Sequence, residues 1–439
     1  MKKLVIFLFI AAFGKLSAQT DTLKLSLNQA MQLGIINRFD VKANRMDIDI
    51  AKNNLLKSKK ELLPELTVNG KLTYYGQIQP SIIPAGYLGF TEPKKIAIGM
   101  KNNTALSMDM NYTIYKPGLY TDLKIFSNNI ELEKEKNNQS DLDIKIEIAV
   151  AYDDILLASL QYEIARKNES RYKEYYGLAQ GKYDNGALLE SELFLAELDY
   201  KNSEANTVKL KQNYLLSIQK LRNRIMIPWQ SVIVLTDSLL SFSTADAPAG
   251  VSSGAVANRS EIKQLTIQQA VYLLQLKKAK QSYLPTLSLF ANYTQFFQGP
   301  ELDYANSFYW APVNYIGIKL SIPITGSLKN INSVNECKLA SAQLALNLKQ
   351  KTADMLYEAE ETTTELFNAK QNLAVAKDNY LLSQKVYELK KQQYNSGSFS
   401  YEKLLDTEKS FSAAEQEYIT AVYAYQVATI NYHKALGDF

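Results

Sequence analysis

The sequence is short of the residues on which metal and disulfide sites depend. It contains one cysteine and one histidine in 439 residues. A disulfide scaffold needs paired cysteines, and a zinc site needs three or four converging ligands. Cys337 lies in a lysine- and alanine-rich helical pattern, where a lone thiol usually acts as a small hydrophobic group, and His433 follows Tyr432 near the C-terminus. We therefore expect no metal-binding residue.

Catalytic and cofactor motifs are also missing. The chain has no GxxxxGK[ST], GxGxxG, GxSxG or HExxH sequence, so the usual phosphate, dinucleotide, acyl-transfer and metalloprotease signatures are absent. Neighbouring acids such as Asp153 and Asp154, or Glu360 and Glu361, are adjacent on helices and cannot face one another across a substrate. The sequence predicts no catalytic residue and no cofactor, and an envelope enzyme would need an activity that depends on one of these acid pairs.

Charge gives no sign of a nucleic-acid partner. Lysine and arginine number 49 against 45 aspartate and glutamate residues, a formal net charge of +4. Lysines and glutamates alternate along helical faces rather than forming a basic stripe. We expect no nucleic-acid binding.

The first residues predict export. Lys2 and Lys3 precede an apolar run at 4–13, and Leu16, Ser17 and Ala18 resemble a small-residue cleavage site. This order is typical of a signal peptide at 1–18, with the mature chain starting near Gln19. The run is too short for a transmembrane helix, and the alternative is a buried N-terminal strand.

The sequence is duplicated. Residues 37–40 and 63–66 recur 221 positions later as 258–261 and 284–287, and 183–186 recur 211 positions later as 394–397. Leu193, Glu197 and Tyr200 are matched by Leu404, Glu408 and Phe411. A period above 200 is far too long for a solenoid repeat, so we expect two pseudo-equivalent halves, at 19–227 and 258–439, joined by a linker at 228–257.

Long helices fill most of each half. Two proline-free runs, 122–182 and 327–394, would each extend roughly 90 to 100 Å at 1.5 Å per residue. Shorter runs at 188–227 and 401–436 follow them after turns at Gly186 and Gly397. The pattern predicts two antiparallel helical hairpins.

Heptads predict how the hairpins pack. The apolar series at seven-residue steps is Leu366, Leu373, Tyr380, Tyr387, Tyr394, then Leu404, Phe411, Tyr418, Tyr425, Tyr432. Such a repeat favours left-handed coiled coils. A second ladder, Ala414, Ala421, Ala428 and Ala435, permits close approach on another face. We expect hairpins packed side by side, although a two-stranded coiled coil would need only one seam.

Four segments alternate apolar and polar residues, within the ranges 64–116 and 284–324. They start near Leu66, Leu106, Leu287 and Ile316, and each is about ten residues long. Strict alternation gives a strand one apolar and one polar face, and ten residues suffice for a tilted strand to cross a membrane. The alternative is a soluble four-stranded sheet covered by helices.

Four strands cannot close a membrane barrel alone, and open edges in hydrocarbon would leave backbone groups unpaired. Two copies would supply eight strands and three would supply twelve. The loops at 78–103 and 299–314 are long and aromatic, which suits the extracellular side. Prolines 64, 117, 285 and 323 mark strand-to-helix junctions that we expect on the periplasmic side.

The whole mature chain resembles the TolC-type outer-membrane efflux proteins. The resemblance rests on the duplicated order of helix, strand pair, long helix, glycine turn and return helix, with Leu-Pro opening a strand and the ending Ala435, Leu436, Gly437. It implies a mainly α fold with a membrane β-barrel portion: a homotrimer whose twelve strands form a barrel in the outer membrane, continued by a periplasmic α-helical barrel. Such proteins are exit ducts that partner a periplasmic adaptor protein and an inner-membrane transporter.

The resemblance also implies a periplasmic gate. The family's constriction carboxylates stand nine and twelve residues after the aromatic residue of the second tip, which here gives Lys403 and Asp406. The ninth position after Tyr183 gives Glu192. One carboxylate matches and one is replaced by lysine, so Asp406 and Glu192 are expected to form rings of negative charge, with Lys403 pairing with one of them; the alternative is that all three are ordinary solvated charges.

The hairpin tips are the second candidate site. Gly186 and Gly397 allow the chain to reverse, which capping alone would explain, and the resemblance adds adaptor docking. The expected docking residues are Tyr183, Asn185, Gly186, Tyr394, Asn395 and Gly397.

The sequence thus predicts a passive export duct, embedded in outer-membrane lipid and not an enzyme. The alternative is a secreted coiled-coil scaffold or tether of the cell envelope, which would not need alternating strands. Cargo and pump class are not encoded in any motif that we recognise.

Overall fold

The computed structural model describes residues 22–239, 256–324, 326–396, 398–437 and 439. The predicted signal peptide, much of the predicted linker and Gly397 lie outside this range. The chain divides into two compact units. We call them the helical unit, Met1–Ala43, Asn137–Ser260 and Thr352–Phe439, and the strand unit, Asn44–Lys136 and Glu261–Lys351.

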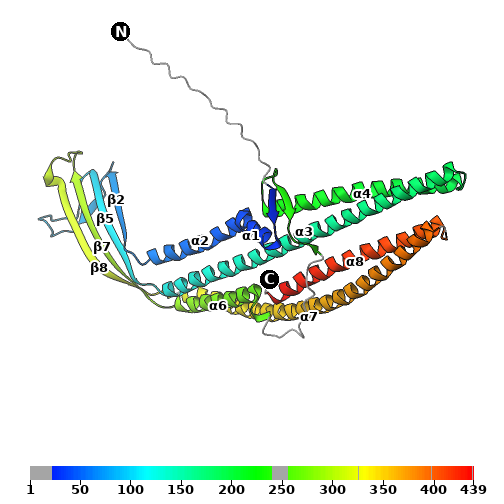
Figure 1. The fold of residues 1–439 in the computed structure, drawn as a ribbon. Coiled ribbons are helices and arrows are strands. Elements are labelled where there is room, and N and C mark those ends of the chain that lie inside the picture. The colour runs from blue at the N-terminus through cyan, green and yellow to red at the C-terminus, as the bar shows by residue number, and fades with distance from the viewer. Residues whose placement is uncertain (1–21, 240–255, 325, 397, 438) are drawn as a thin grey trace, which may run out of the picture. The chain divides into compact units, whose positions relative to one another are not determined.

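The predicted hairpins are present (Figure 1). Helix α3 spans Leu119–Asp184 and is followed by α4, Glu190–Ile225; helix α7 spans Gly326–Asn395 and is followed by α8, Tyr401–Leu436. Gly186 has a φ of 70°, and its N–H and that of Ala187 donate to Tyr183 and Lys182 at 2.8 Å each. This left-handed residue closes the helix end, as the sequence predicts. None of the described helices is both long enough and apolar enough to cross a membrane.

The heptad seam of the helical unit is buried. Leu366, Leu373, Leu404 and Tyr425 are all in the core. Aromatic side chains stack between α7 and α8: Tyr387 lies 5.2 Å from Phe411, and Tyr380 lies 5.4 Å from Tyr418. Between α3 and α4, Tyr176 stacks on Tyr200 at 6.1 Å. These contacts confirm the predicted pairing of each long helix with its return helix.

The duplication is visible in side-chain contacts. Arg38 donates to Glu147 at 2.7 Å, and Arg259, 221 positions later, donates to Glu358 at 2.6 Å. Glu358 follows Glu147 by 211 positions, so the ten-residue slip between the two offsets lies between position 66 and position 147. The stack of Tyr176 on Tyr200 has its counterpart in Tyr387 on Phe411 at the same offset of 211.

The strand unit contains the four predicted strands in one antiparallel sheet. They are β2 (Glu65–Tyr74), β5 (Asn102–Tyr115), β7 (Thr286–Gly299) and β8 (Trp310–Ser321), in the order β2-β5-β7-β8. Helix α2 (Phe39–Lys60) leads into β2, and α6 (Ser260–Gln281) leads into β7. Prolines 64, 117, 285 and 323 each stand between a helix and a strand, where the missing N–H removes no ladder hydrogen bond.

The register places most of the polar residues on one face of the sheet and most of the apolar residues on the other. Thr67, Asp109 and Asn292 form one cross-strand row, and Leu66, Met110 and Ile316 belong to the neighbouring row on the opposite face. On the polar face, Asp109 accepts hydrogen bonds from Asn69, Ser107 and Asn292. Most of the apolar side chains are exposed, so the sheet has no partner for this face within its unit.

Strict alternation fails at the end of β5. It would place Tyr115 on the polar face, but the register shifts between Thr113 and Tyr115, and Tyr115 pairs with Leu287 on the apolar face. A bulge inserts one unpaired residue, so the side chains beyond it lie on the opposite face from the one that strict alternation predicts.

Several elements have no counterpart in the prediction. The short strands β1 (Thr22–Leu25) and β6 (Val232–Leu235) pair in parallel, and β3 (Pro80–Ile83) pairs with β4 (Lys94–Ala97). Helix α1 (Leu27–Asn37) begins with a capping box of Ser26 and Gln29, and a 3-10 turn, η2, spans Ser307–Tyr309.

Candidate functional site

The three predicted gate residues lie near the start of the return helices. Glu192 is in the first turn of α4, and Lys403 and Asp406 are in the first two turns of α8. All three side chains are exposed. Lys403 makes no ion pair within the part of the chain that the structure describes, and its expected pairing with a carboxylate in the trimer stays a prediction.

The tips present some of the predicted docking residues and not others. Tyr183 and Asn185 are exposed beside Gly186, and Nδ2 of Asn185 donates to the carbonyl of Gly181 at 2.7 Å. Tyr394 is different, because only 9% of it is exposed and its ring packs against Lys182 at 4.6 Å. The expectation that Tyr394 projects outward is therefore wrong for this unit, since the tyrosine completes the hairpin seam. Asn395 ends α7, and Gly397 lies outside the described residues.

A buried ion pair that sequence reasoning missed joins the two hairpins. Nε of Arg171, on α3, donates to Oε1 of Glu408, on α8, at 2.8 Å, and Glu408 is fully buried. The guanidinium also faces the rings of Tyr387 and Phe411, at 5.7 and 5.5 Å. Burial raises the pKa of Glu408, and the charge of Arg171 opposes that shift.

Other polar contacts extend this pair into a seam. Asn168 donates to Ser412 at 2.7 Å, the hydroxyls of Tyr175 and Tyr387 are 2.9 Å apart, and Lys182 donates to Tyr394 at 3.1 Å. We call these contacts, with Arg171 and Glu408, the polar seam. Positions 168, 175 and 182 on α3 follow one another at seven-residue steps. This heptad of polar residues was the signal in the sequence that could have predicted the polar seam.

Beyond the polar seam, aspartates gather where β6 meets the hairpins. Asp153 on α3 is 2% exposed, and its Oδ1 has no hydrogen-bond partner among the described residues. Burial, together with the charges of Asp154 and Asp237, raises the pKa of Asp153 to about 7. Asp237 accepts hydrogen bonds from Tyr152 and from the N–H of Leu27, both at 2.9 Å. A carboxyl group in this position is favoured in its neutral form.

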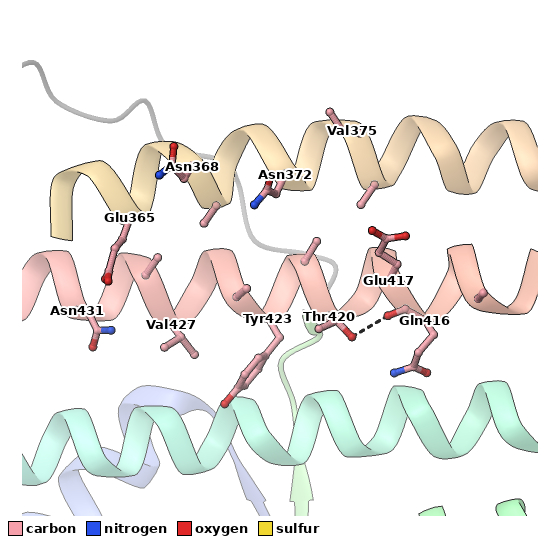
Figure 2. A pocket seen from close by; sticks show the side chains of 16 residues that line it. Glu365, Asn368, Asn372, Val375, Gln416, Glu417, Thr420, Tyr423, Val427 and Asn431 are labelled. Carbon is pink, nitrogen blue, oxygen red and sulfur yellow. Dashed lines mark hydrogen bonds between the residues drawn. The ribbon is translucent and has the colours of Figure 1, made fainter. Parts of the chain in front are cut away.

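A groove runs between α7 and α8 (Figure 2). Its volume is about 1200 Å³, and its walls are mostly small side chains such as Ala369, Ala376 and Ala421. Tyr423 points from α8 toward α3, where its hydroxyl donates to Asp154 at 2.6 Å. Among the described residues that line the groove we find no cluster of reactive groups, and its shape suits helix packing.

Comparison with known proteins places this architecture in one class. Over 97% of the chain, the fold matches a crystal structure of the channel-forming protein CusC with a TM-score of 0.79 and 16% identity, covering 95% of that chain. The Campylobacter jejuni outer membrane channel CmeC matches 94% of the chain with a TM-score of 0.75 and 18% identity, covering 85% of that chain. The fold is that of outer-membrane channel structures.

The sequence comparisons agree. Residues 251–438 match the family model described as outer membrane efflux protein. The cation efflux system protein CusC of Escherichia coli K12 is 24% identical over 296 residues, which are 66% of this chain and 63% of CusC. The outer membrane protein TolC of the same strain is 23% identical over 88% of this chain and 85% of TolC. These matches confirm the resemblance to the TolC-type outer-membrane efflux proteins.

Proposed function

We propose that the chain is the outer-membrane channel of a tripartite efflux or type I secretion system, which passively exports substrates delivered by an inner-membrane pump and a periplasmic adaptor. The observation that carries the proposal is the four-stranded sheet, which has one exposed apolar face and two edge strands. Lipid is the solvent in which such an apolar face is stable, provided that the edges are closed.

Three copies close those edges. β2 and β8 are the outer strands, and because neighbours in the sheet are antiparallel, β2 and β8 run in opposite directions. The β8 edge of one copy therefore fits the β2 edge of the next in a continuous antiparallel barrel. This head-to-tail contact generates a ring. Three copies give twelve strands, wide enough for a lumen.

The helical unit has matching outer surfaces. On α4, Phe194, Val208 and Leu215 are exposed in one seven-residue register; on α7, Val375, Leu382 and Leu389 are exposed in another. An exposed heptad stripe is a coiled-coil seam that lacks its partner. In the trimer, α4 of one copy packs against α7 of the next, which closes an α-helical barrel. The two sequence halves, 19–227 and 258–439, then contribute one hairpin and two strands each.

The exposed charges at the start of the return helices form the gate in this proposal. In the trimer, Asp406 and Glu192 each supply a ring of three carboxylates. Lys403 lies about one helical turn from Asp406 and reduces the negative charge of that ring. Such rings focus cations and disfavour anions. The tips at Tyr183, Asn185, Gly186, Asn395 and Gly397 dock the periplasmic adaptor.

Solubility and assembly test the proposal. The mature protein should require detergent and migrate as a trimer, whereas a secreted coiled-coil scaffold would stay soluble without detergent. Deletion of the gene should sensitise cells to the same compounds as deletion of one inner-membrane pump. Replacing Gly397 with aspartate should abolish efflux and leave trimers in the membrane, and retained transport would remove the docking assignment.

A further inference from the structure

The segment between β2 and β5 forms a separate hairpin whose tip is apolar. Strands β3 and β4 pair only with each other. The turn between them presents Tyr87 and Leu88, which are 70% and 79% exposed. Hairpin tips usually carry small polar residues, so two large apolar side chains at this tip require a separate explanation.

The backbone of the tip is held in an unfavourable conformation for leucine. Leu88 has a φ of 54°, in the left-handed region, between Gly86 at 90° and Gly89 at 77°. The turn is fixed by hydrogen bonds from Gly86 to Phe90 at 2.7 Å and from Phe90 to Tyr87 at 3.1 Å. Strain of this kind persists where surrounding structure or a ligand offsets it, and the described residues of the strand unit leave Leu88 79% exposed.

Lysines follow the apolar tip on its C-terminal side. Lys95 pairs across the hairpin with Ile82, itself 67% exposed. Nζ of Lys94 lies 5.0 Å from the centre of the Phe90 ring. Lys101 follows on the return to β5, and Glu92 is the one acid between positions 78 and 101, which leaves this segment net positive. Lysine stems lie along apolar surface while their ammonium groups reach out to anions.

We infer that the β3–β4 hairpin is a membrane-surface anchor that inserts Tyr87 and Leu88 among the lipids of the outer leaflet and binds their anionic headgroups through Lys94 and Lys95. The inference rests on the proposed function, since β2 and β5 must cross the membrane for the hairpin to emerge at its surface. An apolar tip flanked by cations fits an anionic lipid interface. It fits a second copy of the same hairpin poorly, because like charges would face each other.

Tryptophan fluorescence in lipid nanodiscs tests the tip. The reporter Leu88→Trp is compared with Ile318→Trp, on the apolar face of the sheet, and with Asn185→Trp, at an aqueous helical tip, each against the parent protein with its two native tryptophans. Brominated phospholipids quench only tryptophans that contact lipid. We expect the added fluorescence of Leu88→Trp and Ile318→Trp to fall by about half or more and that of Asn185→Trp to be unchanged.

The variant Ile318→Trp distinguishes failure of the membrane anchor from failure of the channel proposal. Quenching of Ile318→Trp without quenching of Leu88→Trp would overturn the anchor and leave the channel standing. A blue-shifted but unquenched Leu88→Trp would assign the tip to a protein contact instead. If Ile318→Trp is also unquenched, the channel proposal itself is wrong.

Substitution of the two lysines tests whether the hairpin binds anionic headgroups. In the Leu88→Trp background, Lys94→Gln with Lys95→Gln should reduce quenching by about half in discs of anionic phosphatidylglycerol and leave it unchanged in zwitterionic phosphatidylcholine. Lys319→Gln, on the polar face of the sheet, is the matched control and should have no effect. Equal quenching in both lipids, with and without the lysines, would overturn the assignment of an anionic ligand.

Discussion

Nε of Arg171 donates to Oε1 of Glu408 at 2.8 Å, across 237 positions of sequence, and Glu408 is completely buried. The two residues join the first hairpin to the second. Aromatic rings face the guanidinium, and because the Glu408 side chain is 0% exposed while that of Arg171 is 18% exposed, the carboxylate has no water to replace its partner.

Removing the arginine should destabilise the helical unit strongly. Arg171→Leu leaves a buried carboxylate unpaired, which typically costs about 3–5 kcal/mol. The double variant Arg171→Leu with Glu408→Leu should recover most of that loss, as measured by thermal unfolding of the trimer in detergent. Arg166→Leu, an exposed arginine on the same helix, is the control and should cost less than about 1 kcal/mol. Equal melting temperatures for Arg171→Leu and Arg166→Leu would show that the pair contributes nothing.

Asp153 should make stability depend on pH. Its pKa is raised to about 7 in the folded state, so the folded protein binds a proton that the unfolded chain releases near pH 4. The contribution of this proton to the free energy of unfolding is fully present below about pH 4, and it is lost as the pH rises through 7. Asp153→Asn should melt with the parent at pH 4 and be more stable by up to about 4 kcal/mol at pH 8. The exposed Glu190→Gln serves as the control; a constant difference between parent and Asp153→Asn at all pH values would contradict the assignment.

Gly34 should tolerate no side chain. A Cβ at this position would lie 2.1 Å from Cδ1 of Ile148. We expect Gly34→Ala to destabilise by about 1–3 kcal/mol through overpacking, and Ile148→Val, which removes Cδ1, to rescue it. Gly177, on α3, has open space around it, so Gly177→Ala should be neutral or stabilise by up to about 1 kcal/mol. If Ile148→Val does not restore the stability lost in Gly34→Ala, the loss does not come from the contact with Cδ1 of Ile148. The measurement is the melting temperature of Gly34→Ala, of Ile148→Val, of the double variant that combines them, and of Gly177→Ala.

The two faces of the sheet should respond differently to charge. Ile318 is exposed on the apolar face and Thr67 on the polar face. In the proposed barrel, Ile318→Arg faces lipid, which costs about 2–4 kcal/mol near the bilayer midplane, and should reduce the amount of trimer recovered from outer membranes. Thr67→Arg faces the lumen and should assemble normally. Equal recovery of both variants would argue against a lipid-facing sheet.

The gate carboxylates should set ion preference. Asp406→Asn and Glu192→Gln should each lower the cation-over-anion permeability ratio of single channels in planar bilayers, most clearly at low salt, where screening is weak. Glu204→Gln, a half-buried acid further along α4 that pairs with Lys201, is the control. Unchanged reversal potentials in both gate variants would reduce these residues to ordinary solvated charges.

Periodic patterns made most of the fold predictable. The seven-residue steps from Leu366 to Tyr432 predicted a buried seam between helices, and the alternation of apolar and polar residues predicted the strands. Each of these periods is typical of one kind of secondary structure. Gly186 identified its turn since reversal there needs a positive φ. The tip charges were placed by resemblance alone, and their role stays a prediction.

Contacts between distant segments were not predictable in the same way. The parallel pairing of Thr22 with Val232 joins short runs with no periodicity, and the bulge beside Tyr115 depends on the partner strand. In the sequence, Tyr394 belongs both to the heptad series and to the turn, so it could be buried in the seam or exposed at the tip. Its contact with Lys182 shows that it lies in the seam. Glu408 could be paired only after α3 and α8 were known to be neighbours.

The position of Arg171 shows that the two halves have diverged into different roles. The residue 211 positions further on is Leu382, which is exposed, while Glu408 has a glutamate, Glu197, as its counterpart. Both halves thus kept the acid, and one half alone supplies the base. A tandem of two second halves would enclose Glu408 beside a leucine with no arginine to neutralise it, so neither half can substitute for the other.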